Sequence, residues 1–154
     1  MTDRIHRLDG AGVELLPHPE QPGGEIMTDR IRIIHYGLGP IGSHIARVAA
    51  RRDYLEIVGG VDIDPEKAGK DLGHVIGLQK PLGIPVDSSL EAVLARTEAD
   101  VVVHSTGSHI PQVQGQLAAL IKAGLHIVST CEELSYPWAD HPTEAAELDA
   151  LAKS

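Results

Sequence analysis

Cysteine and aromatic residues are scarce in this chain of 154 residues. It has one cysteine, Cys131, and no phenylalanine, and aromatic residues make up only 3% of it. A single cysteine excludes an internal disulfide framework and fits a reducing compartment, so we expect a cytoplasmic protein. Because aromatic side chains are so few, the core must be built from Ile, Leu, Val and Ala.

Basic residues and long apolar runs are also in short supply. The chain has 13 Lys and Arg against 22 Asp and Glu, which gives a net charge of −9. Such a chain repels phosphate backbones, so we expect no nucleic-acid partner. No apolar run approaches the roughly 20 residues that span a bilayer, so we expect no membrane segment. The nine histidines show neither H-E-x-x-H nor another compact ligand pattern, so we expect no metal site.

Residues 1–26 differ in composition from the remainder of the chain. They hold three prolines, a Gly-Gly pair and no apolar period. This composition predicts a poorly ordered leader, which we extend over residues 1–29. The string Met-Thr-Asp-Arg-Ile occurs at 1–5 and again at 27–31. A second interpretation is therefore that the gene model begins upstream of the natural start at Met27.

Residues 30–154 read as one domain in which candidate strands alternate with candidate helices. This alternation requires a parallel sheet, because each crossover between parallel strands is right-handed and carries a helix. We predict an α/β fold, a doubly wound Rossmann sheet with strand order 3-2-1-4-5 and helices on both faces. Residues 71–81 are rich in turns, and we assign no element to them. The predicted strands are 31–36, 55–61, 84–86, 100–104 and 126–129. The three longer predicted helices are 41–52, 111–123 and 142–153. Two shorter helices are predicted from their caps: one opened by Asp64-Pro65, and one that runs from a capping box at Ser88 and Glu91 to about Arg96.

A glycine-rich segment follows the first predicted strand and opens the first helix. It reads Gly37-Leu38-Gly39-Pro40-Ile41-Gly42, and G-x-G-x-x-G in this context indicates dinucleotide binding. Gly37 permits a tight turn, Gly39 lets a pyrophosphate approach the backbone, and Gly42 lets the helix lie against the strand. The helix start, with Pro40 and Ile41, offers a partial positive charge and unpaired N–H groups. The alternative is an ordinary turn.

An acidic residue follows this segment at the spacing of a dinucleotide site. Asp62 ends the second predicted strand, about 20 residues after Gly42. A carboxylate there accepts hydrogen bonds from the adenosine ribose and repels a 2′-phosphate. The next residue is Ile63 rather than an arginine, which slightly favours NAD over NADP. Lys67 and Lys70 are close enough in sequence to contact a phosphate through a loop, so NADP stays open, as does a mere helix-capping role for Asp62.

Small polar residues follow the fourth predicted strand. Open parallel sheets bind ligands beyond the carboxyl ends of their strands, where the strand order reverses. Ser105, Thr106 and Gly107 occupy that place. They would let the nicotinamide ribose pass close to the backbone, and either hydroxyl could hydrogen-bond to it. The alternative is that they only cap the helix that begins at Pro111.

The segment after the fifth predicted strand should line the nicotinamide side of the same crevice. It contains Cys131 and Glu132, followed by Glu133. Either glutamate could accept a hydrogen bond from the carboxamide or from a substrate amine, unless the segment is only a solvated loop. Cys131 has no identifiable activating base, so we interpret it as a small buried spacer rather than a nucleophile.

Two histidines lie near the ends of strands that this topology makes neighbours. His35 belongs to the first predicted strand and His104 to the fourth. We therefore expect the two side chains to come near each other beneath the crevice, with the role of buried core residues.

Together these segments resemble the dihydrodipicolinate reductase-like oxidoreductases, most of all the branch that includes 2,4-diaminopentanoate dehydrogenase. The resemblance covers about residues 30–154, and Cys-Glu-Glu-Leu-Ser-Tyr-Pro at 131–137 is its most specific part. It implies hydride transfer between NAD or NADP and an amino acid or imine. It also implies that the glycine segment holds the pyrophosphate, Asp62 the adenosine ribose, and Ser105–Gly107 the nicotinamide side.

Members of this family are about twice as long as this chain. The resemblance implies a second domain that carries most substrate-binding and catalytic groups and mediates oligomerisation. That domain is absent from these 154 residues, so the catalytic residues stay unknown and we expect cofactor binding without turnover. A full-length protein would take a small-molecule substrate and form a homo-oligomer. Two alternatives stay open: a noncatalytic nucleotide-sensing module that acts through a partner, and an interaction domain that binds no nucleotide.

Overall fold

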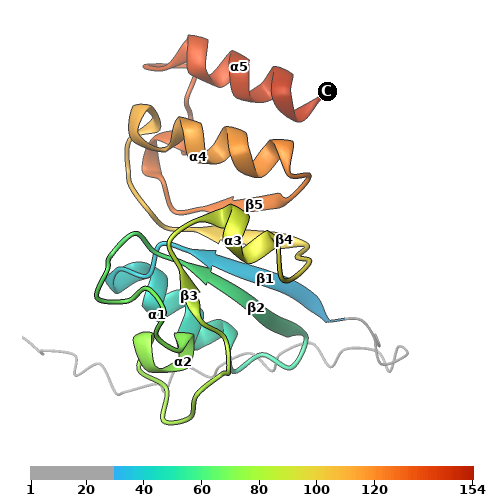
Figure 1. Cartoon of the computed structure of the whole chain (residues 1–154). Helices are drawn as coiled ribbons and strands as arrows, with labels where there is room; N and C mark the ends of the chain where they lie inside the picture. Colours follow the sequence, from blue (N-terminus) through green and yellow to red (C-terminus); the bar gives the residue numbers. More distant parts are fainter. Residues whose placement is uncertain (1–29) are drawn as a thin grey trace, which may run out of the picture.

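The structure is a computed structural model that describes residues 30–154 (Figure 1). The predicted leader lies outside the described residues. Within residues 30–154, no helix combines the length and the apolar character needed to cross a membrane. The elements, in chain order, are β1 Ile31–Tyr36, α1 Pro40–Ala49, β2 Leu55–Val61, α2 Leu72–Val75, β3 Val86–Asp87, α3 Leu90–Leu94, β4 Val101–His104, α4 Ile110–Lys122, β5 His126–Ser129, the 3-10 helix η1 Glu132–Ser135, and α5 Pro142–Ala152.

The five strands form one parallel sheet in the order β3-β2-β1-β4-β5. This order confirms the predicted fold class and topology. β1 lies between β2 and β4, with Tyr36 opposite Val61 on one side and His104 on the other. The strand order reverses at β1, between the half of the sheet with β2 and β3 and the half with β4 and β5. Because β1, β2 and β4 are parallel, their carboxyl ends lie at the same edge of the sheet. That edge is where open parallel sheets hold their ligands.

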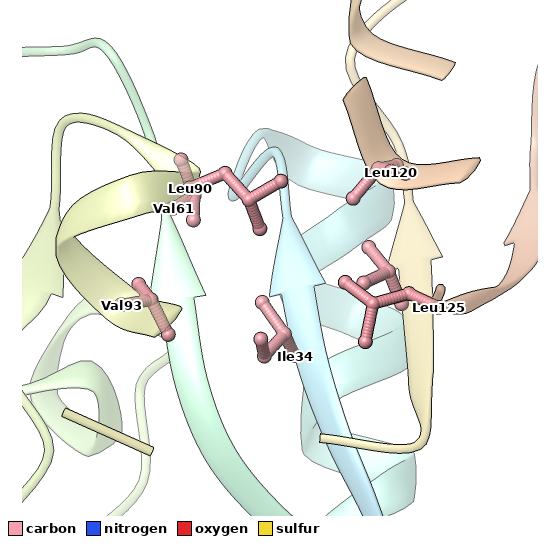
Figure 2. Packing of buried hydrophobic residues seen from close by; sticks show 7 residues of the cluster. Ile34, Val61, Leu90, Val93, Leu120 and Leu125 are labelled. Atoms are coloured by element: carbon pink, nitrogen blue, oxygen red, sulfur yellow. The ribbon is translucent and has the colours of Figure 1, made fainter. Parts of the chain in front are cut away.

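Helices cover both faces of the sheet (Figure 1). On one face, α3 and α4 pack against side chains of β1, β2 and β4, as Figure 2 shows. On the other face, α1 and α2 cover a second apolar cluster, and α5 packs on the outer side of α4. The core is aliphatic, as the absence of Phe predicts. The buried residues in Figure 2 are Ile34, Val61, Leu90, Val93, Val102, Leu120 and Leu125.

Two local predictions between β2 and α3 were wrong, and one segment left unassigned contains a short helix. Residues 65–69 form turns rather than a helix, because Gly69 adopts φ +79° and its amide turns away to donate to Val86 O. α2 lies within the segment to which we assigned no element. The cap of α3 is Ser89 rather than Ser88, since the Ser89 hydroxyl accepts a hydrogen bond from Ala92 N at 3.3 Å.

The expected approach of His35 and His104 was also wrong, although β1 and β4 are neighbours. Tyr36 lies opposite His104, and His35 lies opposite Val103. Because side chains alternate between faces along a strand, the two histidines point to opposite faces of the sheet. The His104 ring instead meets the Tyr36 ring edge-on, with 5.6 Å between the ring centroids. Both histidines are fully buried.

Candidate functional site: the crevice beyond β1, β2 and β4

The glycine segment forms the connection from β1 to α1, and its three glycines have different surroundings. Gly37 adopts φ +91°, and a Cβ atom there would lie 2.4 Å from Ser105 O. A Cβ atom at Gly42 would lie 1.9 Å from Gly37 O. At Gly39, by contrast, nothing lies within 4 Å of the place of a Cβ atom. Gly37 and Gly42 therefore allow the close packing, and Gly39 faces open space.

The start of α1 points its positive end at this open space. Gly39 is the N-cap and offers no side-chain cap, and Pro40 is the first helical residue. The first turn of α1 has no acidic side chain that could take the place of an external anion. A ten-residue helix with an uncapped start favours a bound anion, because its first N–H groups and its dipole both attract negative charge.

Two hollows lie on either side of Gly39. The first, which we call the Asp62 hollow, has a volume of about 220 Å³. The second, the Glu132 hollow, has a volume of about 320 Å³. They share Gly39, Ser105 and Thr106. The Asp62 hollow is lined by Tyr36, Gly37, Gly39, Asp62, Ile63, Lys67, Ser105, Thr106 and Gln116, and the Glu132 hollow by Gly39, Pro40, Ile41, Ser105, Thr106, Gly107, Ser108, Thr130 and Glu132.

Most of the residues that the sequence predicted for the site thus line one hollow or the other. Two do not. Gly42 packs against the backbone of Gly37, and its lack of a side chain only allows α1 to lie close to the glycine segment. Cys131 is 4% exposed and packs in an apolar cluster with Ile110 and Val113 of α4. Cys131 is therefore a buried spacer that lines neither hollow.

Asp62 holds the glycine segment and the turn after β2 together. Its Oδ2 atom accepts a hydrogen bond from Leu38 N at 2.7 Å and another from Lys67 Nζ at 3.0 Å. Its Oδ1 atom accepts from Asp64 N at 2.9 Å. Burial raises the pKa of Asp62, but these hydrogen bonds from Asp64, Leu38 and Lys67 outweigh it, so the pKa lies below its usual value. The carboxylate therefore stays ionised at the wall of the hollow.

A polar network around the buried His104 ring supports the other wall of the Asp62 hollow. His104 Nε2 lies 2.8 Å from both Gln116 Oε1 and Thr106 Oγ1, and His104 Nδ1 lies 3.0 Å from Ser129 Oγ. Ser129 Oγ also accepts from Cys131 N at 3.1 Å. Burial lowers the pKa of His104, against a smaller opposing contribution from Gln116, so the ring is neutral near pH 7. The network ties the loops after β4 and β5 to α4.

The sequence did not point to Gln116, which reaches the hollow from the second turn of α4. No local signal marks it, because only the packing of α4 against the end of β4 brings it to His104. Tyr36 was also missed as a lining residue. Its position at the end of β1 could have indicated it, since the ends of all three strands meet here.

The two glutamates after β5 have separate positions. Glu132 lines the Glu132 hollow. Glu133 instead receives hydrogen bonds from Ile110 N at 2.7 Å and lies 2.7 Å from His109 Nδ1 and 3.1 Å from His141 Nε2. The bonds from His109 and Ile110 lower the pKa of Glu133. Glu133 thus caps α4, and of the two only Glu132 is available to a ligand in the crevice.

This fold and this site define a Rossmann-type domain with an open glycine turn. The chain belongs to the dihydrodipicolinate reductase N-terminal family, because the model of that family, described as dihydrodipicolinate reductase, N-terminus, matches residues 31–132. The chain is 30% identical over 130 residues to 2,4-diaminopentanoate dehydrogenase of Acetoanaerobium sticklandii, with 81% of this chain and 35% of the relative covered.

Solved structures agree with this assignment. Amine dehydrogenase from Mycobacterium smegmatis superposes with a TM-score of 0.77 at 36% identity, over 82% of this chain and 37% of that one. The WlbA dehydrogenase from Bordetella pertussis, in complex with NADH and UDP-GlcNAcA, superposes with a TM-score of 0.60 at 26% identity, over 83% of this chain and 33% of that one. The chain thus spans about a third of the length of these relatives.

Proposed function

We propose that this chain is the cofactor-binding domain of an oxidoreductase and binds NAD(H) or NADP(H) across its two hollows. The observation that carries the proposal is the open space at Gly39, which two adjoining hollows share. A pyrophosphate above Gly39 would meet the positive end of α1. The adenosine ribose would then lie in the Asp62 hollow and the nicotinamide half in the Glu132 hollow.

The residues present fit such a cofactor. Asp62 is an ionised acceptor at the wall of its hollow, as ribose hydroxyls require. Ser105 lines both hollows, and its buried hydroxyl has no hydrogen-bond partner among the described residues, so it can turn to a bound group. Small residues such as Gly107 and Ser108 leave room for a flat ring in the Glu132 hollow.

The bound nicotinamide would supply or accept the hydride, and the residues of this chain would orient it. Hydride transfer requires the ring to lie about 3–3.5 Å from the substrate carbon. Thr106, held by His104 and Gln116, would fix the ribose beside the ring. Glu132 at the far end of its hollow would accept a hydrogen bond from the carboxamide or from an amino group of the substrate.

The names of the relatives support an amino acid, amine or imine as the substrate class. They are a 2,4-diaminopentanoate dehydrogenase and an amine dehydrogenase. The whole protein, in this proposal, carries its catalytic groups in a second domain, acts in the cytoplasm and assembles as a homo-oligomer. Its partners are small molecules and not nucleic acids, which agrees with the net charge of −9.

Calorimetric titration of the chain with NADH and with NADPH tests this function. We expect at least one of them to bind with a dissociation constant between about 1 μM and 1 mM, the range in which enzymes hold such ligands. Circular dichroism on the same sample shows that the chain is folded. A folded chain that gives no binding heat with either cofactor at millimolar concentration would contradict the proposal.

A further inference from the structure

Lys67 occupies an unusual place in the Asp62 hollow. It lies in the turn after β2, and among the described residues that line this hollow it is the one basic side chain. Its Nζ atom lies 3.0 Å from Asp62 Oδ2 and 3.5 Å from Asp64 Oδ2. The side chain is 27% exposed, so the ammonium group borders both the carboxylates and the open space. A positive charge therefore stands next to the predicted place of the adenosine ribose.

The hydrogen bonds of Asp62 leave room for a ribose while Lys67 stays paired. Each carboxylate oxygen can accept about two hydrogen bonds. Oδ2 already accepts from Leu38 N and Lys67 Nζ, whereas Oδ1 accepts only from Asp64 N. One acceptor position is therefore left at Oδ1. A ribose hydroxyl of NAD(H) can use it, and the ion pair does not have to open.

The same ion pair weakens the usual barrier to a 2′-phosphate. A lone carboxylate at this position repels the phosphate, because two negative charges would lie within a few ångströms of each other. Here Lys67 compensates the charge of Asp62. The ammonium group stands on a flexible four-carbon stem, so it can turn toward a new anion without movement of the backbone. A phosphate carries more negative charge than either carboxylate and offers more acceptors.

We propose that Lys67 is a specificity-determining residue that holds the 2′-phosphate of NADP(H), so that the crevice takes both NAD(H) and NADP(H). The inference rests on the proposed function. With NAD(H), Lys67 stays on Asp62 and Asp64, and the ribose binds the free position of Asp62. With NADP(H), the ammonium group turns from these carboxylates to the phosphate. Ile63, which is 81% exposed beside it, leaves this edge of the hollow open to the larger cofactor.

A purely structural role for Lys67 makes a different prediction. If Lys67 only stabilised the turn at 65–69, its removal would weaken the binding of both cofactors alike, because the glycine segment that Asp62 holds through Leu38 N would shift for both. If it holds the phosphate, its removal separates the two cofactors. Lys70 provides the matched control, since it belongs to the same turn region, lines neither hollow, and pairs with Glu66 at 3.8 Å while 60% exposed.

The test is calorimetric titration of the whole chain and its Lys67→Gln, Lys67→Arg and Lys70→Gln variants with NADH and NADPH. We expect Lys67→Gln to raise the dissociation constant of NADPH at least about tenfold and that of NADH less than about threefold, the loss of one charge-assisted hydrogen bond. Lys67→Arg should retain most of the NADPH affinity, and Lys70→Gln should change neither constant. Thermal unfolding of each variant shows that it is folded.

Each other outcome overturns the inference in a distinguishable way. Equal losses of NADH and NADPH in Lys67→Gln would assign Lys67 to the turn alone. A wild-type chain that binds NADH but not NADPH would overturn the inference and leave the proposed function standing. A folded wild-type chain that binds neither cofactor would overturn both.

Discussion

The two hollows beside Gly39 are built differently. The Asp62 hollow has charged walls, and its carboxylate is already paired with Lys67 and with backbone amides. The Glu132 hollow is lined mainly by small residues and by Ile41, which is 62% exposed, and Glu132 is its one charged residue among those described. The Asp62 hollow therefore presents both an acceptor and a basic side chain, whereas the Glu132 hollow presents a carboxylate with no basic side chain among its lining residues. In the proposed function, the adenosine end of the cofactor would lie in the hollow that has both kinds of charge.

Substitution of the glycines should disturb both hollows most strongly. Gly42→Ala would place a Cβ atom 1.9 Å from Gly37 O, a backbone atom that cannot move cheaply. We expect a loss of about 3 kcal/mol in the free energy of unfolding and of more than about 100-fold in NADH affinity. Urea unfolding and calorimetry measure the two effects. A variant of normal stability and affinity would show that α1 does not pack against the glycine turn in this way.

Gly39→Ala is the matched variant, since a Cβ atom there has open space and the backbone of Gly39 suits alanine. We expect normal stability but about tenfold weaker NADH binding, because the new methyl group would occupy the space of the pyrophosphate. Normal affinity in Gly39→Ala would argue that no diphosphate lies above residue 39.

Removal of one charge from each hollow should show the difference between them. We expect Asp62→Asn to weaken NADH binding about tenfold and NADPH binding less, because the 2′-hydroxyl group that would donate to Asp62 is free only in NAD(H). Glu132→Gln should weaken either cofactor by no more than about threefold, since its amide can still accept a hydrogen bond. Calorimetry of both variants measures this. Equal losses of NADH and NADPH in Asp62→Asn would mean that Asp62 does not reach the ribose.

A smaller effect is expected from the wall that both hollows share. Thr106→Val removes the hydroxyl that lies 2.8 Å from His104 Nε2 and 2.5 Å from Gln116 Oε1. We expect about threefold weaker NADH binding and about 1 kcal/mol less stability, because the buried His104 ring loses one hydrogen-bond partner. Thr97→Val serves as the control, because Thr97 lines neither hollow. No difference between the two variants would show that the network does not support the crevice.

A change in pH should have the smallest effect on cofactor affinity. It should instead change the free energy of unfolding through His35, which is buried in the sheet. Burial lowers the pKa of His35 to about 4, and its ring nitrogens have no hydrogen-bond partner among the described residues. The unfolded chain takes up this proton near pH 6.5 and the folded chain does not, so stability falls as the pH drops through this range. Between pH 7.5 and 5 we expect a loss of about 2 kcal/mol.

His35→Leu should make urea unfolding less dependent on pH in that window, with a remaining contribution from His104 in the same direction. The affinity for NADH should change little wherever the chain stays folded, because Asp62 keeps its charge. An unchanged pH dependence in His35→Leu would contradict the account of His35.

The parts of the fold that could be predicted are those with strong local patterns. The runs at 31–36 and 101–104 are rich in β-branched residues and strongly predict buried strands. The rule that crossovers between parallel strands are right-handed then favours the observed strand order. The spacing from Gly37 to Gly42 and on to Asp62 likewise predicted that Asp62 lies beside the glycine segment, where it lines the Asp62 hollow. In both cases the sequence signal and the tertiary contact involve the same residues.

The parts that were missed depend on single-residue offsets or on tertiary packing. A one-residue difference in register decides that His104 meets Tyr36 instead of His35. α2 has only four residues, too few to show a helical period. Asp64-Pro65 opens a turn with the same signals that open a helix, and the conformation of Gly69 ends it. The contact of Gln116 with the crevice arises only when α4 packs onto the sheet.

The most direct test of the central claim is an NMR titration of the amide-labelled chain with NADH. The account predicts that the largest shifts fall on the backbone amides of residues 37–39 and 41–43, on either side of Pro40, which has no N–H group, with further shifts at Asp62 and Thr106. Shifts confined to residues of α4 and α5 that line neither hollow, such as Leu117 and Leu148, or no shifts at saturating NADH in a folded chain, would contradict a diphosphate cradle at Gly39.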